Sequence, residues 1–396
     1  MSDENKKSFP LPPARRILIV AGEASGDLHG AGLVAEMISI HPALQFRGIG
    51  GNRMQAAGVE LMAHVSDMAI IGIKEILPKL GFLRKTIRQL KQIMDEWKPE
   101  MVVLIDYPDF NLYVAARAAR KRGIKVFYYI SPQVWAWRKG RIRQIKRLVD
   151  RMAVILPFEV DVYAKEGFHV DFVGHPLLDM VKPDLTKPEA RRSLGIDENR
   201  TTIGLLPGSR SAEIRKLFVD MLDAARIIQS RIPDVQFVLP LAQTLDETII
   251  TGPIAASGLP VKIVSGKTYD VMACCDLAVV TSGTATLETG LMGVPTVIIY
   301  KIPRIEYWIG RMMVSARNIG LCNIIAGKTI MPELIQKDAC GPTIAREALA
   351  ILHNEERKRR IIDDLANIRT SLGSPGAASR AAAIACDLLD RGMPKT

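Results

Sequence analysis

Acidic side chains follow apolar runs in the first part of the chain. Asp106 comes directly after the run Met101 to Ile105, and Asp109 comes three residues later. A carboxylate at the carboxyl end of a buried strand is a natural general base for a hydroxyl nucleophile. Asp106 is the first candidate because it ends the strand directly, whereas Asp109 could instead cap the helix that follows. Glu23, after the run Ile17 to Gly22, lies where an acceptor could be held.

A polar turn of a different kind lies within the segment Asp276 to Tyr300, which predicts a strand, a helix and a second strand. Backbone N–H groups at the start of a helix have no internal partner, so this turn can bind phosphate oxygens. Gly283 permits close approach of a ligand, and Glu288, about one turn further on, can reach a sugar hydroxyl. The simpler alternative is that Ser282 and Thr284 only cap a scaffold helix.

A third loop repeats this arrangement. The apolar run Thr202 to Leu206 predicts a buried strand, and Pro207-Gly208-Ser209-Arg210 follows it. Gly208 and Ser209 expose backbone donors, and Arg210 supplies a fixed cation for a diphosphate leaving group. The alternative is an arginine in a surface salt bridge, which contributes little.

Parallel strands alternating with helices must position these loops. The predicted strands are residues 17–22, a short strand leading into a glycine turn within 46–51, and residues 101–105, 125–130, 153–157, 172–174, 202–206, 235–239, 261–264, 277–280 and 295–300. A chain of 396 residues exceeds what one hydrophobic core supports, so we predict two α/β domains. The predicted divisions are a leader (1–16), a first domain (17–180), a second domain (181–345) and C-terminal helices (346–396). Those helices are expected to pack back on the first domain or on a partner subunit.

Composition narrows the class of partner. The net charge of +11 comes without a zinc-finger, basic-zipper or aromatic RNA-binding signature, so we predict no nucleic-acid partner. A membrane surface, a phosphorylated substrate or a solvated basic surface explains the charge equally well. Five cysteines without a C-x-x-C pair predict no metal site and fit a reducing cytoplasm.

Membrane association is expected to be peripheral, because no apolar run approaches the roughly 20 residues that span a bilayer. The segment Ile70 to Leu83 is apolar and bordered by lysine and arginine, as a membrane-surface segment would be. An ordinary core helix has the same pattern.

Several of these motifs occur together in one order along nearly the whole chain. They are AGEASGD (Ala21 to Asp27), GIGGNRM (Gly48 to Met54), IDYPDFN (Ile105 to Asn111), SPQVWAWR (Ser131 to Arg138), VGHPL (Val173 to Leu177), LLPGSR (Leu205 to Arg210) and SGTATLE (Ser282 to Glu288). Together they resemble the lipid-A-disaccharide synthases, glycosyltransferase family 19. The resemblance implies the GT-B fold, in which two Rossmann-like domains face each other across a cleft.

The resemblance also implies an activity and its partners. The family transfers 2,3-diacylglucosamine from UDP-2,3-diacylglucosamine to 2,3-diacylglucosamine 1-phosphate, giving a β-1,6 disaccharide 1-phosphate and UDP. It implies an enzyme without a cofactor in the cytoplasm of a Gram-negative bacterium, peripheral on the inner membrane through Ile70 to Leu83. A homodimer is compatible with this expectation.

Site residues carry over by position. Asp106 matches the family's candidate base, and Glu23 matches an acidic position of the same site. The positions that match the nucleotide side are Arg210, Ser209, Ser282, Gly283, Thr284 and Glu288, and Asn323 matches a further polar position. The expected reaction is a single displacement with inversion, without a metal.

Two alternative functions stay open. The first is another nucleotide-sugar enzyme, such as a UDP-N-acetylglucosamine epimerase or the peptidoglycan lipid-intermediate glycosyltransferase. The second is a non-catalytic basic protein that binds anionic lipid or nucleic acid.

Overall fold

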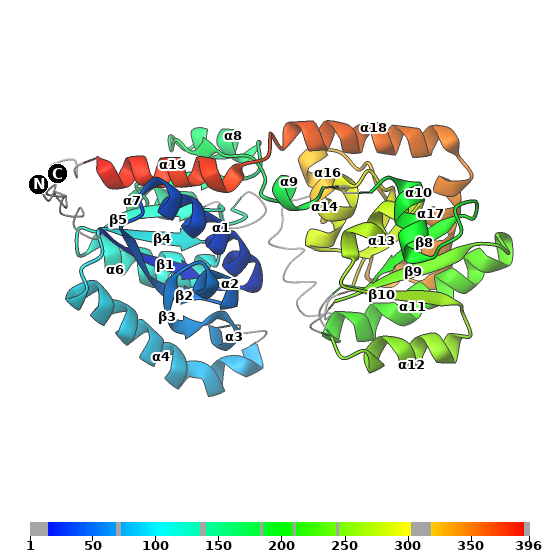
Figure 1. Ribbon diagram of the computed structural model, residues 1–396, viewed down its shortest axis with the longest axis horizontal. Helices are drawn as coiled ribbons and strands as arrows, with labels where there is room; N and C mark the ends of the chain where they lie inside the picture. The colour runs from blue at the N-terminus through cyan, green and yellow to red at the C-terminus, as the bar shows by residue number, and fades with distance from the viewer. Residues whose placement is uncertain are drawn as a thin grey trace, which may run out of the picture. The chain divides into compact units, whose positions relative to one another are not determined.

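The computed structural model describes residues 15–68, 73–134, 140–182, 185–208, 211–242, 245–301 and 318–391, without the side chains of 73–80 and 212. The chain divides into two compact units, one formed by Met1–Pro176 with Pro375–Thr396 and the other by Leu177–Ser374. Each unit is built on its own parallel sheet with helices on both faces (Figure 1). The predicted α/β class is confirmed.

The first unit holds a seven-stranded parallel sheet of order β3-β2-β1-β4-β5-β6-β7. Its elements are β1 (Arg15–Ala21), α1 (Ala24–Ile40), β2 (Leu44–Gly50), α2 (Asn52–Ala56), β3 (Val59–His64), α3 (Val65–Met68), α4 (Ile73–Glu96), β4 (Met101–Ile105), α5 (Pro108–Phe110), the π-helix η1 (Asn111–Ala115), α6 (Ala116–Arg120), β5 (Lys125–Tyr129), α7 (Arg141–Leu148), β6 (Arg151–Val154), α8 (Glu159–Ala164), β7 (Asp171–Phe172) and α19 (Ala377–Asp390).

Both faces of this sheet are buried, which explains why its strands are apolar throughout. Successive β4 residues point to opposite faces, so Val103 packs with α1 and α19 in one core, whereas Leu104 packs with α4 and α6 in another.

Asp27 of α1 connects this helix to the start of α2. Its buried carboxylate accepts hydrogen bonds from the backbone N–H groups of Gly51 (2.7 Å) and Met54 (3.0 Å), and so caps α2 instead of its own helix.

The second unit holds a six-stranded parallel sheet of order β10-β9-β8-β11-β12-β13. Its elements are α9 (Leu177–Met180), α10 (Lys187–Leu194), β8 (Thr202–Leu206), α11 (Ser211–Arg231), β9 (Gln236–Leu241), α12 (Thr248–Ser257), β10 (Val261–Ser265), α13 (Thr268–Cys274), β11 (Leu277–Thr281), α14 (Thr284–Leu291), β12 (Thr296–Tyr300), α16 (Leu321–Ala326), β13 (Glu333–Ile335), the 3-10 helix η2 (Gln336–Asp338), α17 (Gly341–Leu352) and α18 (Glu355–Ser371).

The C-terminal helices belong to different units. α17 and α18 pack on the second unit, whereas α19 packs against α1, β5 and β6 of the first. Lys125 holds the end of α19, because its ammonium group donates to the carbonyl groups of Leu388 (3.0 Å) and Leu389 (2.9 Å). A cation at the C-terminus of a helix also interacts favourably with the helix dipole. The division between the units falls after Pro176, four residues before the boundary expected from the sequence.

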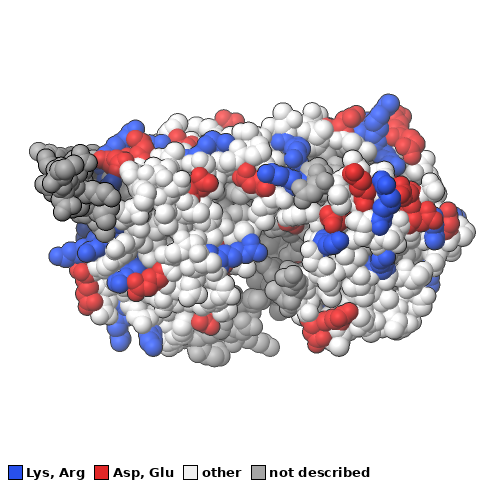
Figure 2. All heavy atoms as spheres, viewed as in Figure 1, with Lys and Arg blue, Asp and Glu red and all other residues white. Residues whose placement is uncertain are grey.

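The described residues show neither a face of one charge in Figure 2 nor a membrane-spanning helix. Cationic and anionic side chains are interspersed over the face of the molecule in Figure 2. Within the described parts of the chain, each helix is too short or too polar to cross a bilayer.

Candidate active site

The chain crosses over to opposite sides of β1 and β4, which makes these neighbouring strands the topological switch point of the first sheet. Ligands of open α/β sheets bind outside the carboxyl ends of the strands at such a point. Ala21 pairs with Ile105 at this edge, so the loops that carry Glu23 and Asp106 lie side by side. Glu23 is exposed at the start of α1, whereas Asp106 is largely withdrawn from solvent.

Asp106 has the electrostatics of a general base. Its pKa is raised to about 6, chiefly by burial and also by the nearby negative charge of Glu23, while a hydrogen bond from the backbone of Tyr107 acts in the opposite direction. A base is most effective when its pKa lies near the working pH. A carboxyl group with a pKa of about 6 is ionised at neutral pH and still accepts a proton readily.

The backbone at this position is strained. Asp106 and Tyr107 have φ angles of 44° and 43°, in the left-handed region that residues with a Cβ rarely adopt. This conformation costs on the order of 1–2 kcal/mol per residue. The Tyr107 ring contributes to holding it, since it packs directly over Gly22 and stacks on Phe110 at a centroid distance of 5.8 Å. Backbone strain that surrounding contacts maintain is typical of functional sites.

Asp109 lies in a different environment. Its side chain is 69% exposed and forms an ion pair with Arg141, whose own side chain is only 8% exposed. The Asp109 carboxylate is thus already engaged by a guanidinium group. The two acidic side chains that the sequence offered as bases therefore have different surroundings, since Asp106 is largely withdrawn from solvent and Asp109 is exposed and ion-paired.

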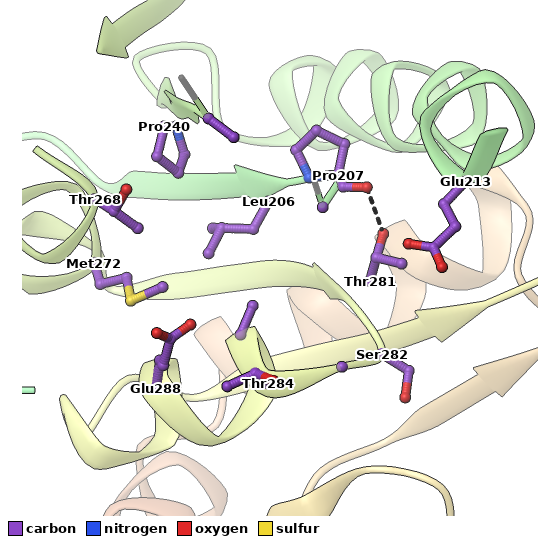
Figure 3. A pocket seen from close by; sticks show the side chains of 14 residues that line it. Leu206, Pro207, Glu213, Pro240, Thr268, Met272, Thr281, Ser282, Thr284 and Glu288 are labelled. Carbon is purple, nitrogen blue, oxygen red and sulfur yellow. Dashed lines mark hydrogen bonds between the residues drawn. The ribbon is translucent and has the colours of Figure 1, made fainter. Parts of the chain in front are cut away.

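The second unit carries a pocket at its own switch point, between β8 and β11. The cavity has a volume of about 310 Å³, within the usual range of small-molecule sites. Its lining consists of Leu206, Pro207, Gly208, Glu213, Pro240, Ala242, Thr268, Met272, Thr281, Ser282, Gly283, Thr284, Ala285 and Glu288 (Figure 3). The two loops that form one side are joined by a hydrogen bond of 3.1 Å from the Thr281 hydroxyl to the Pro207 carbonyl.

The polar turn at the start of α14 faces this pocket. Gly283 is the N-cap residue of α14, and no side chain caps the helix, so neither Ser282 nor Thr284 acts as its cap. A Cβ added at Gly283 would meet no described atom within 4 Å. The first turn of α14 is therefore open to a ligand, and its backbone N–H groups suit an anion.

Glu288 lines the pocket on the side of Met272 (Figure 3). Its carboxylate accepts a hydrogen bond of 3.0 Å from the Tyr269 hydroxyl. Burial raises the pKa of Glu288, and the bond from Tyr269 opposes that shift. The carboxylate is thus oriented by one partner and can accept a further hydrogen bond, as from a sugar hydroxyl. The sequence pattern contained no signal for Tyr269, because it precedes the turn by a whole strand.

Asn323 is not among the described residues that line this pocket. Its side chain is completely buried, and its amide group donates to the Met331 carbonyl (2.8 Å) and to Glu333 (2.7 Å). Its oxygen accepts from the backbone N–H groups of Ile330 (2.9 Å) and Met331 (3.0 Å). Both donors and both lone pairs are therefore used inside the protein.

Some predicted positions lie partly or wholly outside the described residues. Ser209 and Arg210 are among them, as are residues 70–72 and the side chains of residues 73–80. At the end of that segment, Phe82 and Leu83 pack against the core of the first unit. The described residues contain no group of three His, Cys, Asp or Glu side chains that could hold a metal ion.

Two α/β units, each built on its own parallel sheet with a switch point, define the GT-B fold class. The fold is similar to that of CalG4, the calicheamicin glycosyltransferase (TM-score 0.61, 17% identity, 96% of this chain and 99% of that one). It is also similar to UDP-GlcNAc 2-epimerase from Neisseria meningitidis, solved bound to UDP-GlcNAc (TM-score 0.61, 13% identity, 94% and 99%).

Sequence comparison then gives the family. The family model described as lipid-A-disaccharide synthetase matches residues 17–386. The lipid-A-disaccharide synthase of Syntrophus aciditrophicus (strain SB) is 53% identical over 379 residues, which cover 96% of this chain and 99% of that protein. The chain belongs to the lipid-A-disaccharide synthase family, the glycosyltransferases of lipid A biosynthesis.

Proposed function

We propose that the protein transfers 2,3-diacylglucosamine from UDP-2,3-diacylglucosamine to 2,3-diacylglucosamine 1-phosphate, and that it releases UDP and a β-1,6-linked disaccharide 1-phosphate. The family supports the reaction class. The observation that carries the assignment of roles is the contrast between the switch points. One presents a carboxyl group with a pKa of about 6, and the other presents an open helix N-terminus beside a cavity of about 310 Å³.

The proposed chemistry is a single displacement. Asp106 accepts the proton of the acceptor 6-hydroxyl while the oxygen attacks the anomeric carbon of the donor. The bond from that carbon to the UDP oxygen breaks, so the configuration inverts. Glu23 has no proton-transfer role in this scheme, and its negative charge helps to keep the Asp106 pKa high.

The donor would bind in the second unit. The first turn of α14, at Ser282, Gly283 and Thr284, is suited to the diphosphate, where it would stabilise the negative charge that develops on the leaving group. Glu288 is placed to accept a hydrogen bond from a ribose hydroxyl. Ser209 and Arg210 are proposed to assist at the diphosphate on the basis of the sequence alone.

The direct test is turnover of purified protein with both lipid substrates. We expect one UDP released per disaccharide formed, no UDP release without the acceptor, and a β-anomeric signal in the product by proton NMR. Epimerised UDP-sugar without UDP release, or retention of configuration, would refute the proposal.

Two further proposals concern assembly. We propose that the protein binds the inner membrane through Ile70 to Leu83, which co-sedimentation with anionic vesicles tests. We also propose a homodimer, which light scattering tests.

A further inference from the structure

The main-chain carbonyl of Asp106 is held by side chains from two other elements. The Tyr128 hydroxyl of β5 donates to this oxygen at 2.5 Å, and the Asn111 amide group donates to it at 2.8 Å. The same amide group also donates to the Ile105 carbonyl at 3.2 Å. Both side chains are completely buried. Three hydrogen bonds thus converge on the carbonyl groups of Ile105, which ends β4, and of Asp106, where the left-handed turn begins.

These side-chain hydrogen bonds replace the backbone hydrogen bonds that β4 no longer makes where it ends. The backbone N–H of Asp106 still donates to the neighbouring strand, at the Tyr129 carbonyl (3.3 Å). The left-handed turn that begins at the same residue takes its carbonyl out of the ladder, and a buried carbonyl needs a partner. Asn111 begins the π-helix η1, and short π-helical segments recur at functional sites.

The Tyr128 hydroxyl keeps its proton and so remains a hydrogen-bond donor. Burial raises the pKa of Tyr128 well above its ordinary value, and the negative charge of Asp106 acts in the same direction. The phenol therefore stays protonated over the whole range in which Asp106 titrates. Its partner oxygen belongs to the same residue as the reacting carboxylate, so the bond acts on Asp106 directly.

We propose that Tyr128 and Asn111 are positioning residues for Asp106: by binding its carbonyl they hold the left-handed backbone and so aim the carboxylate. The inference rests on the proposed role of Asp106 as the base. In this arrangement the Asp106 carboxylate accepts a hydrogen bond from the backbone N–H of Tyr107. The position of the carboxylate depends on the backbone angles that Tyr128 and Asn111 maintain.

Tyr128→Phe is the cleanest test, because it removes one hydroxyl and keeps the packing of the ring. We expect kcat to fall about 10-fold, while KM for donor and acceptor stays within about twofold. The acid limb of the kcat profile should move from about pH 6 toward the ordinary aspartate range, because a released carboxylate becomes better solvated. Tyr129→Phe is the matched control, since Tyr129 is equally buried on the same strand but belongs to the opposite core. It should keep kcat and the acid limb of the wild type.

Asn111→Ala is the second variant, with the same expected signature and a larger loss of stability, because it also leaves a cavity. Thermal melts establish that each variant is folded at the assay temperature. A normal kcat and an unchanged acid limb in folded Tyr128→Phe would overturn the inference. Equal losses in Tyr128→Phe and Tyr129→Phe would do the same, since they would show a general effect of buried hydroxyl groups.

The double variant Asp106→Asn/Tyr128→Phe separates this inference from the proposed function. If Tyr128 acts through Asp106, the double variant should be no slower than Asp106→Asn alone. Full additivity of the two losses would overturn the positioning role and leave the base assignment intact. Near-normal turnover of Asp106→Asn would refute the base itself, and the positioning role with it.

Discussion

The two units have the same topology at their switch points, yet the loops there differ in how they are filled. In the first unit, a Cβ added to Gly22 would lie 2.0 Å from Cγ of Tyr107, so the ring already occupies that space. In the second, a Cβ added to Gly283 would meet no described atom within 4 Å. The same strand, turn and helix arrangement thus yields a constrained loop around a buried acid and an open turn for a ligand. Side chains delivered from neighbouring elements decide between these outcomes.

The largest expected effect is the loss of kcat when Asp106 is replaced. Asp106→Asn should lower kcat by about 10²–10⁴-fold, the usual contribution of a general base. Asparagine tolerates the left-handed backbone, so the loop should keep its conformation. The affinity for UDP, measured by calorimetry, should stay within about twofold, because the proposed pocket lies in the other unit. In the wild type, kcat should rise with pH through about 6 as Asp106 ionises. Substantial activity of the variant at any pH would contradict the assignment.

The same substitution should stabilise the protein at neutral pH. The fold raises the Asp106 pKa from 3.8 to about 6, so the folded state binds the proton more tightly than the unfolded state. The wild type therefore loses stability as the pH rises from about 4 to 6, and the loss persists above pH 6. We expect Asp106→Asn to be more stable by about 1–3 kcal/mol at pH 7.5 and nearly equal at pH 4, by chemical denaturation. A less stable variant at pH 7.5 would argue against desolvation as the cause.

Gly22→Ala tests the filled loop. The added methyl group collides with the Tyr107 ring, so we expect a loss of about 1–3 kcal/mol of stability and a displaced turn at Asp106. Denaturation curves and kcat should both change. Gly22→Ala combined with Tyr107→Ala removes the collision, and should recover part of the stability. An unaffected single variant would show that the ring moves aside freely.

Gly283→Ala tests the open turn. The methyl group has room in the fold, so stability should change by no more than about 0.5 kcal/mol. It would project at the first turn of α14, where the diphosphate is proposed to bind. We expect the Kd for UDP to rise about 10-fold, measured by calorimetry. Unchanged UDP affinity would place the nucleotide elsewhere.

The smallest effect is expected at the second acid of the first unit. Asp109→Asn should lower kcat by no more than about fivefold, because Asp109 is exposed and paired with Arg141. The acid limb of the pH profile should stay near 6. A loss as large as that of Asp106→Asn would reverse the order of the two aspartates.

The alternation of strands and helices could be predicted closely from the sequence. The expected strands Met101 to Ile105 and Thr202 to Leu206 coincide with β4 and β8, and the helix expected after Gly283 begins at Thr284. These elements follow from apolar runs and local turn signals, whose effects act within a few residues. Because parallel strands bring their carboxyl ends to one edge, the sequence also indicated which loops would lie at that edge.

Contacts between residues remote in the sequence were decided only by the tertiary structure. Asp106 and Asp109 are close together in the sequence, but Asp106 is largely withdrawn from solvent near Glu23, whereas Asp109 is paired with Arg141 from a different element. Asn323 resembles a site residue by position, yet its hydrogen bonds are all used internally. The residues that hold Asp106, Tyr128 and Asn111, carry no mark of that role in their own neighbourhoods. Burial and the partner of each polar group depend on how distant segments pack, which local periodicity does not encode.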